Sequence, residues 1–392
     1  MLLLLVPVGL ATVIGLFVLW PSGEPTQAQQ VAETYLPPGT TYPDARVVSL
    51  ETFDCASDSS APPTTCATAV VEILDGEGAG DFQQIELQAD VVAAGVEVGD
   101  DLVLTRDAGA EGGATYGFFD FERDIPIIVL AIAFAVVVTA VARLRGLAAL
   151  AGLAFAFVVL LQFVLPGLLA DDSPTLVSLV GSAAIMFVVL YLAHGFSART
   201  TTALVGTLFG LTLVAVLGSI AVSAAHLTGL NSEETIQLHG YDPTLDFSGL
   251  VLAGIVVAGL GVLNDVTITQ ASAIWQLHEV SPEMSWRELY RRGMAVGRDH
   301  IASTVYTIVF AYAGASLPLL LLFEVYSQPF WTIVTSSALA EEVIRTLVGA
   351  IALVLAVPVT TAAGAFFAKA ADTEAGAATE RQMSALRARF AG

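Results

Sequence analysis

The chain has 392 residues, of which 55% are hydrophobic and 13% charged, and its mean hydropathy is +0.76. This composition excludes an ordinary soluble globular protein and indicates several membrane spans. The net charge of −22 arises mostly in residues 21–123, where Arg46, Arg106 and Arg123 are the only basic residues. So acidic a segment disfavours nucleic-acid binding, because it offers phosphates no basic patch. It serves either to solubilise the segment or to meet a divalent cation or a cationic partner.

The first apolar run, Leu2–Trp20, is either a cleaved signal peptide or a retained anchor. It lacks a basic start, its apolar core is long for a signal peptide, and no small-x-small cleavage site follows at once. We therefore expect residues 1–23 to form a transmembrane anchor. The missing basic start also fits a natural N-terminus further upstream.

Residues 24–123 are expected to form the one sizeable soluble domain. Five β-prone segments, ARVVSL, ATAVVEIL, FQQIELQA, DLVLTR and TYGFFDF, are separated by Gly- and Asp-containing breaks. This spacing predicts a small β-rich domain, either a barrel of OB-like type or a sandwich. Cys55 and Cys66 are the only cysteines, and an even pair in an outward-facing domain favours a disulfide over free thiols or a metal site.

Apolar runs long enough to cross a hydrocarbon core of roughly 30 Å recur along the chain. We expect about eight spans, at residues 2–20, 125–142, 147–165, 175–195, 201–225, 248–275, 300–323 and 343–366. The predicted fold class is therefore an all-α polytopic membrane bundle with one small extracytoplasmic β-rich domain. Residues 124–368 would form a seven-helix bundle, followed by a basic cytoplasmic tail at 369–392.

The charges between the spans predict the orientation. With the N-terminus inside, the inner loops carry Arg143, Arg145, Arg199, Arg287, Arg291, Arg292 and Arg298, whereas the outer loops carry Asp171, Asp172, Glu233, Glu234, Asp242, Asp246 and Glu324. This is a positive-inside pattern. It predicts a multi-pass protein of the bacterial cytoplasmic membrane, with both termini in the cytoplasm and residues 24–123 outside.

Asn264 and Asp265 lie inside a long apolar run, residues 249–275. A carboxylate there costs several kcal/mol unless it is paired, neutralised or wetted. At 1.5 Å per residue, Asp265 lies about 24 Å along the sixth span, in the inner third of the membrane. Because burial favours the neutral form of a carboxyl group, one possible role is proton or cation binding. The alternative is a structural carboxylate bonded to another helix.

Polar side chains with helical spacing continue on both sides of the next loop. They are Asp265, Thr269 and Ser272 on the sixth span, and His300, Ser303, Thr304 and Thr307 on the seventh, with Asp299 at its cytoplasmic mouth. Because the two spans are consecutive and antiparallel, we predict that these stripes face each other around an inward-open polar cavity. Asp265, with Asn264, Thr269 and His300, would couple a proton or an ion there. His300 and the hydroxyl groups are equally explained by structural contacts between helices.

Glu341, Glu342 and Arg345 form a second cluster at the start of the last span. Glu341 and Arg345 are four residues apart, so they can pair along one helix face. Arg345 lies about 36 Å along a helix from Lys369, near the outer boundary, where it cannot easily reach Asp265. An interfacial salt bridge is the simplest interpretation.

Two further patterns concern the helices themselves. Residues 286–292 follow Ser281-Pro282 and predict a short capped helix on the bilayer surface, or an ordinary connector, before the seventh span. Gly206 and Gly210 have the spacing that lets membrane helices approach closely.

Enzyme signatures are absent from the sequence. It contains no H-E-x-x-H, G-x-S-x-G or G-x-x-x-x-G-K-[ST] motif, and no segment is long enough for a nucleotide-binding domain. We therefore expect no catalytic activity, no cofactor and no metal centre.

The segments GVLNDVTITQASAIWQL (261–277) and GRDHIASTVYTIVFAYAGASLPLLLL (297–322) resemble the YibE/F family of bacterial membrane proteins. Residues 123–150 fit the same family, and the resemblance covers most of the chain. It implies a multi-span fold without an established activity.

A weaker resemblance links the chain to SecF and the resistance-nodulation-division superfamily. The matching features are Asn264-Asp265, the basic segment Arg287–Arg292, the polar segment His300–Thr307 and the start of the last span at 340–353. The chain departs from SecF by two extra spans, by Val266 in place of threonine, and by an outer domain without a clear βαβ pattern. This resemblance implies coupling to the proton-motive force through Asp265.

Together these patterns predict a proton- or ion-coupled transporter, permease or export accessory. Its expected partners are the lipid bilayer, a small ion or proton, and a membrane-protein partner or a second copy of the chain. The alternative is a non-transporting scaffold whose outer domain binds partner proteins.

Overall fold

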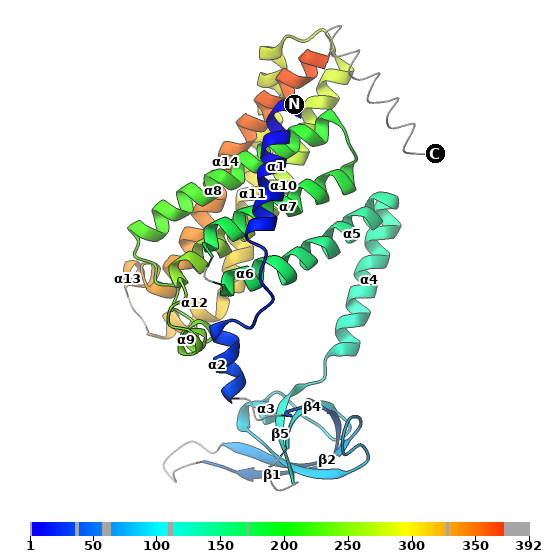
Figure 1. The fold of residues 1–392 in the computed structure, drawn as a ribbon, viewed down its shortest axis with the longest axis vertical. Helices are drawn as coiled ribbons and strands as arrows, with labels where there is room; N and C mark the ends of the chain where they lie inside the picture. Colours follow the sequence, from blue (N-terminus) through cyan, green and yellow to red (C-terminus); the bar gives the residue numbers. More distant parts are fainter. Residues whose placement is uncertain are drawn as a thin grey trace. The chain divides into compact units, whose positions relative to one another are not determined.

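The structure is a computed structural model that describes residues 2–35, 39–56, 64–108, 113–170, 172–326 and 329–371. The chain divides into two compact units, one formed by Met1–Ala28 with Val138–Gly392 and the other by Gln29–Val137. The first unit is helical, and the second, here called the β unit, contains the sheet (Figure 1). Most of the predicted basic tail lies outside the described residues.

Five strands form one antiparallel sheet in the β unit. They are β1 (Asp44–Asp54), β2 (Thr65–Ile73), β3 (Phe82–Leu87), β4 (Asp101–Ala108) and β5 (Ala114–Phe121), in the order β3-β2-β1-β4-β5. The edge strands β3 and β5 also contact each other, and the short helix α3 (Ala89–Ala93) connects β3 to β4. The described strands therefore form one rolled sheet of OB-like type, not the two sheets of a sandwich.

The core of this sheet follows from strand periodicity. Alternate side chains of β2 and β4 are buried, among them Ala69, Val71, Leu102 and Leu104, while their neighbours are more exposed. Because successive side chains of a strand point to opposite faces, this alternation gives the sheet one apolar face. Helix α2 (Gln27–Tyr35) precedes the first strand.

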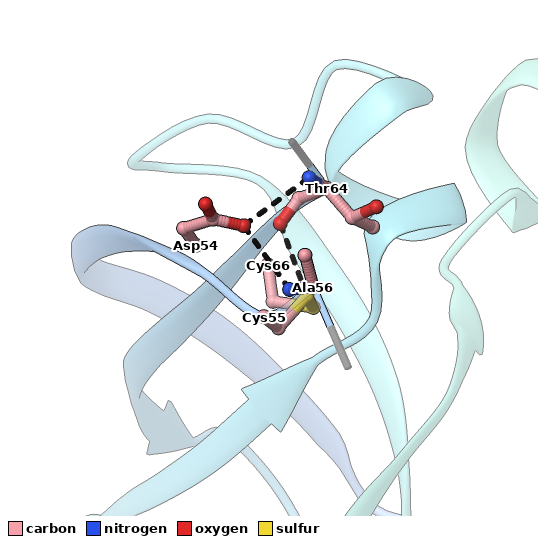
Figure 2. Close-up of a disulfide and its surroundings, with 5 residues drawn as sticks. All are labelled: Asp54, Cys55, Ala56, Thr64 and Cys66. Carbon is pink, nitrogen blue, oxygen red and sulfur yellow. Dashed lines mark hydrogen bonds between the residues drawn. A yellow bond between two sulfur atoms is a disulfide. The ribbon is translucent and has the colours of Figure 1, made fainter. Parts of the chain in front are cut away.

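Cys55 and Cys66 form a disulfide that joins the end of β1 to the start of β2 (Figure 2). Asp54 holds the same end of the hairpin, because its Oδ1 accepts hydrogen bonds from the backbone N–H groups of Ala56 at 3.0 Å and Thr64 at 3.2 Å. The backbone N–H of Cys55 also donates to the carbonyl oxygen of Thr64 at 2.8 Å. A covalent bond and three hydrogen bonds thus close the same connection.

Among the described residues, six helices are long and apolar enough to cross a membrane. They are α4 (Asp124–Ala142), α5 (Leu144–Val159) with its continuations η1 (Leu160–Val164) and α6 (Leu165–Leu169), α7 (Pro174–His194), α8 (Ala198–Ala224), α10 (Phe247–Val280) and α14 (Ser337–Ala371). A seventh candidate is the pair α11 (Trp286–Ala315) and α12 (Leu317–Tyr326), which is bent by 64°. Helix α1 (Leu2–Val18) is apolar but has only 17 residues. Seven of the predicted spans each coincide with an apolar helix, the span predicted at 300–323 coincides with parts of the bent pair α11 and α12, and the total of eight is not confirmed.

The prediction of a separate short helix at residues 286–292 is wrong. Helix α11 runs without a break from Trp286 to Ala315, and the Ser285 side chain caps its start. The buried glycines of this segment are packing positions, since a Cβ at Gly293 would meet Ile274 and one at Gly297 would meet Val357. The helix ends instead at Ala315, just before Pro318, which lacks a backbone N–H donor and lies in the first turn of α12, where no such donor is needed.

Helices α8, α10 and α14 pack against one another and form the centre of the helical unit. Glycines allow the close approach: Gly206 faces Thr360 of α14, and Gly210 faces Leu263 of α10. Helix α11 packs on α14 and α10, and α7 packs on α10 and α5. The short helices α9 (Glu233–Tyr241) and α13 (Phe330–Val334) belong to the connections. The centre of the unit is therefore built from helices far apart in sequence.

Replacing Cys55 and Cys66 together by serine is expected to lower the unfolding free energy of the β unit by about 3 kcal/mol, because the disulfide closes a short loop in the unfolded chain. Thermal unfolding of the full-length protein in detergent, with and without reductant, measures this change. Reductant should destabilise the wild type to the level of the variant and leave the variant unaffected. Equal stability of the two proteins without reductant would contradict the expectation.

Asp44 is expected to make the stability of the β unit depend on pH. Burial raises the pKa of the Asp44 carboxyl group, and the negative charges of Asp75, Glu122 and Asp124 raise it further. Because the folded-state pKa is raised, this group favours folding most at low pH, and that contribution is lost as the pH rises through the folded-state value. Asp44→Asn should therefore stabilise the β unit at pH 8 and change it little at pH 4. The rate of proteolysis within the β unit at the two pH values tests this sign, and destabilisation at pH 8 would refute it.

Candidate functional site

Asp265 on α10 and His300 on α11 lie beside each other, as the sequence predicts for two antiparallel helices. The Nε2 atom of His300 is 3.9 Å from the Oδ2 atom of Asp265. This separation is too long for a hydrogen bond but close enough for a charge interaction once the imidazole is protonated. The two groups therefore form a pair whose interaction depends on proton occupancy.

The Asp265 side chain lies on the outside of the helical unit. It is 69% exposed, whereas the His300 side chain is 27% exposed. Thr269, Asp299, Ser303 and Thr307 are also exposed. The two polar stripes are therefore adjacent, but they open onto the surface of the single chain.

Three of the hydroxyl groups of these stripes bond to their own helices. Ser272 donates to the carbonyl oxygen of Ile268 at 2.7 Å, and Thr304 donates to that of His300 at 2.9 Å. Thr307 donates to the carbonyl oxygen of Ser303 at 3.2 Å. These hydrogen bonds need no ligand and do not converge on Asp265.

Asn264 points elsewhere than its neighbour in sequence. Its Oδ1 atom is buried and has no hydrogen-bond partner among the described residues, and the same holds for Nε2 of His300. The backbone carbonyl of Asn264 accepts a 3.3 Å hydrogen bond from Thr267 Oγ1. The part of the chain that the structure describes therefore gives no direct bond between the Asn264 amide and the Asp265 carboxylate.

A second polar group, fully buried, lies on the opposite face of α10 and was not singled out as a site from the sequence. Gln270 Nε2 donates to the carbonyl oxygen of Gly293 at 2.9 Å and to Thr361 Oγ1 at 2.7 Å. Thr267 Oγ1 and Thr207 Oγ1 lie 2.7 Å apart and share a hydrogen bond. These contacts join α10 to α8, α11 and α14. The three-residue spacing of Thr267 and Gln270 could have indicated this buried polar group from the sequence, since it places both side chains on one face of the helix.

Arg345 of α14 is the centre of the third cluster. Its guanidinium lies 2.8 Å from Glu341 and 3.6 Å from Glu342. It packs against Gly254 of α10, where a Cβ would come within 3.0 Å of Nη1. The Asn231 side chain extends the cluster by donating to Glu341 Oε2 at 3.0 Å. At 1.5 Å per residue, Gly254 and Asp265 are about 16 Å apart along α10, so Arg345 and Asp265 belong to separate sites.

A polar hollow occurs at the N-terminal end of α10, away from the predicted cavity. Its volume is ≈ 550 Å³, and its polar lining includes Thr175, Ser219, Ser223, His226, Asp246 and Ser248. Within the described residues, no group of three or more His, Cys, Asp or Glu side chains could hold a metal ion. The described arrangement brings together an acid and an imidazole at Asp265 and His300 and hydrogen bonds between helices at Gln270 and Thr267.

Gln270→Leu is expected to lower the stability of the helical unit by about 2 kcal/mol, because the change removes two buried hydrogen bonds, to the carbonyl oxygen of Gly293 and to Thr361 Oγ1. Gln276→Leu is the matched control, since Gln276 is exposed on the same helix. Thermal unfolding in detergent compares the two variants. A loss for Gln270→Leu no larger than that for Gln276→Leu would show that the buried network does not stabilise the unit.

Comparison with known families covers most of the helical unit. Residues 130–370 match the family model described as YibE/F-like protein. The matched residues include the Asp265–His300 pair, the buried network and the Arg345 cluster but none of the five strands. No curated protein and no solved structure matches the chain. The similarity to SecF stays a prediction. Because the match extends over more than half of the 392 residues, the chain belongs to the YibE/F-like family.

Proposed function

We propose that this integral membrane protein is a proton- or ion-coupled transporter, permease or export accessory of the bacterial cytoplasmic membrane. Asp265 is the coupling carboxylate, and His300 is its partner. The observation that carries the proposal is the 3.9 Å approach of these two titratable groups on neighbouring helices of a membrane bundle. The proposal involves no enzymatic reaction, cofactor or metal.

The Asp265–His300 pair can link protonation to helix packing. When the carboxylate is ionised and the imidazole is protonated, they attract each other and hold α10 against α11. Loss of either charge removes this attraction and leaves the remaining charge to be solvated inside the membrane, which is costly. A proton that arrives or leaves therefore changes the free energy of the α10–α11 contact.

The bend between α11 and α12 supports a moving element. The two helices differ in direction by 64° at Ser316, so the span that carries His300 is broken on the side away from Asp265. Broken spans are common in transporters, where they let one half of a helix move relative to the other. In the proposed orientation, α10 and α11 meet at the cytoplasmic side and the bend lies toward the outside.

A scaffold role is the second candidate, and the exposure of Asp265 favours it. The polar groups inside the helical unit, Gln270 and Thr267, are bonded to neighbouring helices, as a static bundle would require. In this case the surface around Asp265 would bind a partner, and the β unit would bind further proteins. The same family membership is compatible with both roles.

Asp265→Asn should reduce the rate of proton movement at least about tenfold, because the amide cannot exchange a proton near neutral pH. A tenfold change in rate corresponds to about 1.4 kcal/mol of activation free energy. The measurement is the rate of internal pH change in proteoliposomes under an imposed gradient. Glu279→Gln is the control, since Glu279 is an exposed carboxylate at the end of the same helix. Equal rates for wild type and Asp265→Asn would refute the coupling role and favour the scaffold.

A further inference from the structure

One face of the helical unit carries small and polar residues where a lipid-facing surface would normally be apolar. We call it the Asp265 face, and it consists of Gly261, Asp265 and Thr269 on α10 with His300, Ser303 and Thr307 on α11. Five of these residues are exposed, and His300 is partly exposed. The hydrophobic effect does not favour such a face in contact with lipid.

Elsewhere, the exposed positions on the spans include large apolar side chains. Val216 and Ile220 on α8 are 52% and 62% exposed, and Ile351 and Leu355 on α14 are 47% and 44% exposed. Large apolar side chains of this kind suit contact with acyl chains. The contrast indicates that the Asp265 face is covered by something other than lipid.

The loosely packed helices α1 and α4 offer no charged cover. Helix α4 has no buried residue, and Thr139 is the only polar side chain between Asp124 and Ala142. Helix α1 carries Thr12 as its only polar side chain, and this hydroxyl already donates to the carbonyl oxygen of Val8. Neither helix can neutralise a carboxylate.

The Asp265 face is self-complementary in charge. It presents an acid and an imidazole, and because they lie 3.9 Å apart they occupy the same depth in the membrane. A two-fold rotation about the membrane normal keeps that depth, so the acid of one copy can meet the imidazole of another. Gly261 leaves space for close approach, since a Cβ there would meet nothing within 4 Å.

We propose that the Asp265 face is the contact between two copies of this chain, in which the two Asp265–His300 pairs come together near a two-fold axis. Each carboxylate then has imidazole neighbours from both copies, and the small residues of α10 and α11 pack backbone to backbone. The contact removes the charged groups from lipid without a cover from elsewhere in the part of the chain that the structure describes. This interaction is independent of transport, because a static dimer would need it as much as a coupled one.

Cysteine cross-linking in native membranes tests the proposed contact. The two natural cysteines are joined, so a single introduced cysteine is the only free thiol. Thr269→Cys should give a covalent dimer on mild oxidation, whereas Thr212→Cys, an exposed threonine on α8, should give at least about tenfold less. Equal or lower cross-linking at Thr269 would overturn the proposal.

A bulky side chain supplies the second measurement. Gly261→Leu should raise the dissociation constant of the dimer at least about tenfold in lipid nanodiscs or liposomes, which corresponds to 1.4 kcal/mol. Gly349→Leu on α14 is the matched control, because a Cβ at Gly349 also meets nothing within 4 Å. Single-molecule counting of labelled full-length protein gives the dimer fraction. A monomeric wild type, or a dimer that Gly261→Leu leaves intact, would contradict the proposal even if proton movement is observed.

Discussion

A polar side chain in the hydrocarbon of a membrane must find a partner, and this constraint organises the helical unit. Gln270 meets it with Gly293 and Thr361, Thr267 with Thr207, and Arg345 with Glu341. All of these groups are buried or half-buried. An unpaired polar group in such surroundings would cost several kcal/mol. The glycines that face these helices follow from the same need, because hydrogen bonds between helices form only where the backbones approach closely.

The buried Asn264 Oδ1, which has no hydrogen-bond partner among the described residues, is one departure from this arrangement, and Asp265 is another. It has a charge partner in His300, but most of its carboxylate lies on the surface of the single chain. A group that is expensive in lipid and lies on a surface has to be wetted, protonated or covered. The proposed coupling role uses protonation, and the proposed dimer contact uses cover. Both place the functional chemistry midway along α10 and α11, away from the Arg345 cluster.

Much of this architecture could be predicted from the sequence. Hydropathy located the apolar helices, and the even cysteine pair pointed to the disulfide. Helical spacing brought Asp265 next to His300, because two consecutive antiparallel helices leave little choice of partner. The partners of Thr267 and Gln270 could not be predicted, since Thr207 and Thr361 are 60 and 91 residues away in sequence. The length of α11 was also missed, because residues 286–292 were expected to form a short helix or a connector of their own, whereas α11 runs unbroken to Ala315.

The central claim is that Asp265 and His300 act as one unit. A double-mutant cycle of proton flux in proteoliposomes, with Asp265→Asn, His300→Gln and the double variant, tests it most directly. If the pair is the coupling unit, the two single variants lose similar activity and the double variant loses no more than either. Losses that multiply in the double variant, or a His300→Gln variant with wild-type flux, would contradict the account.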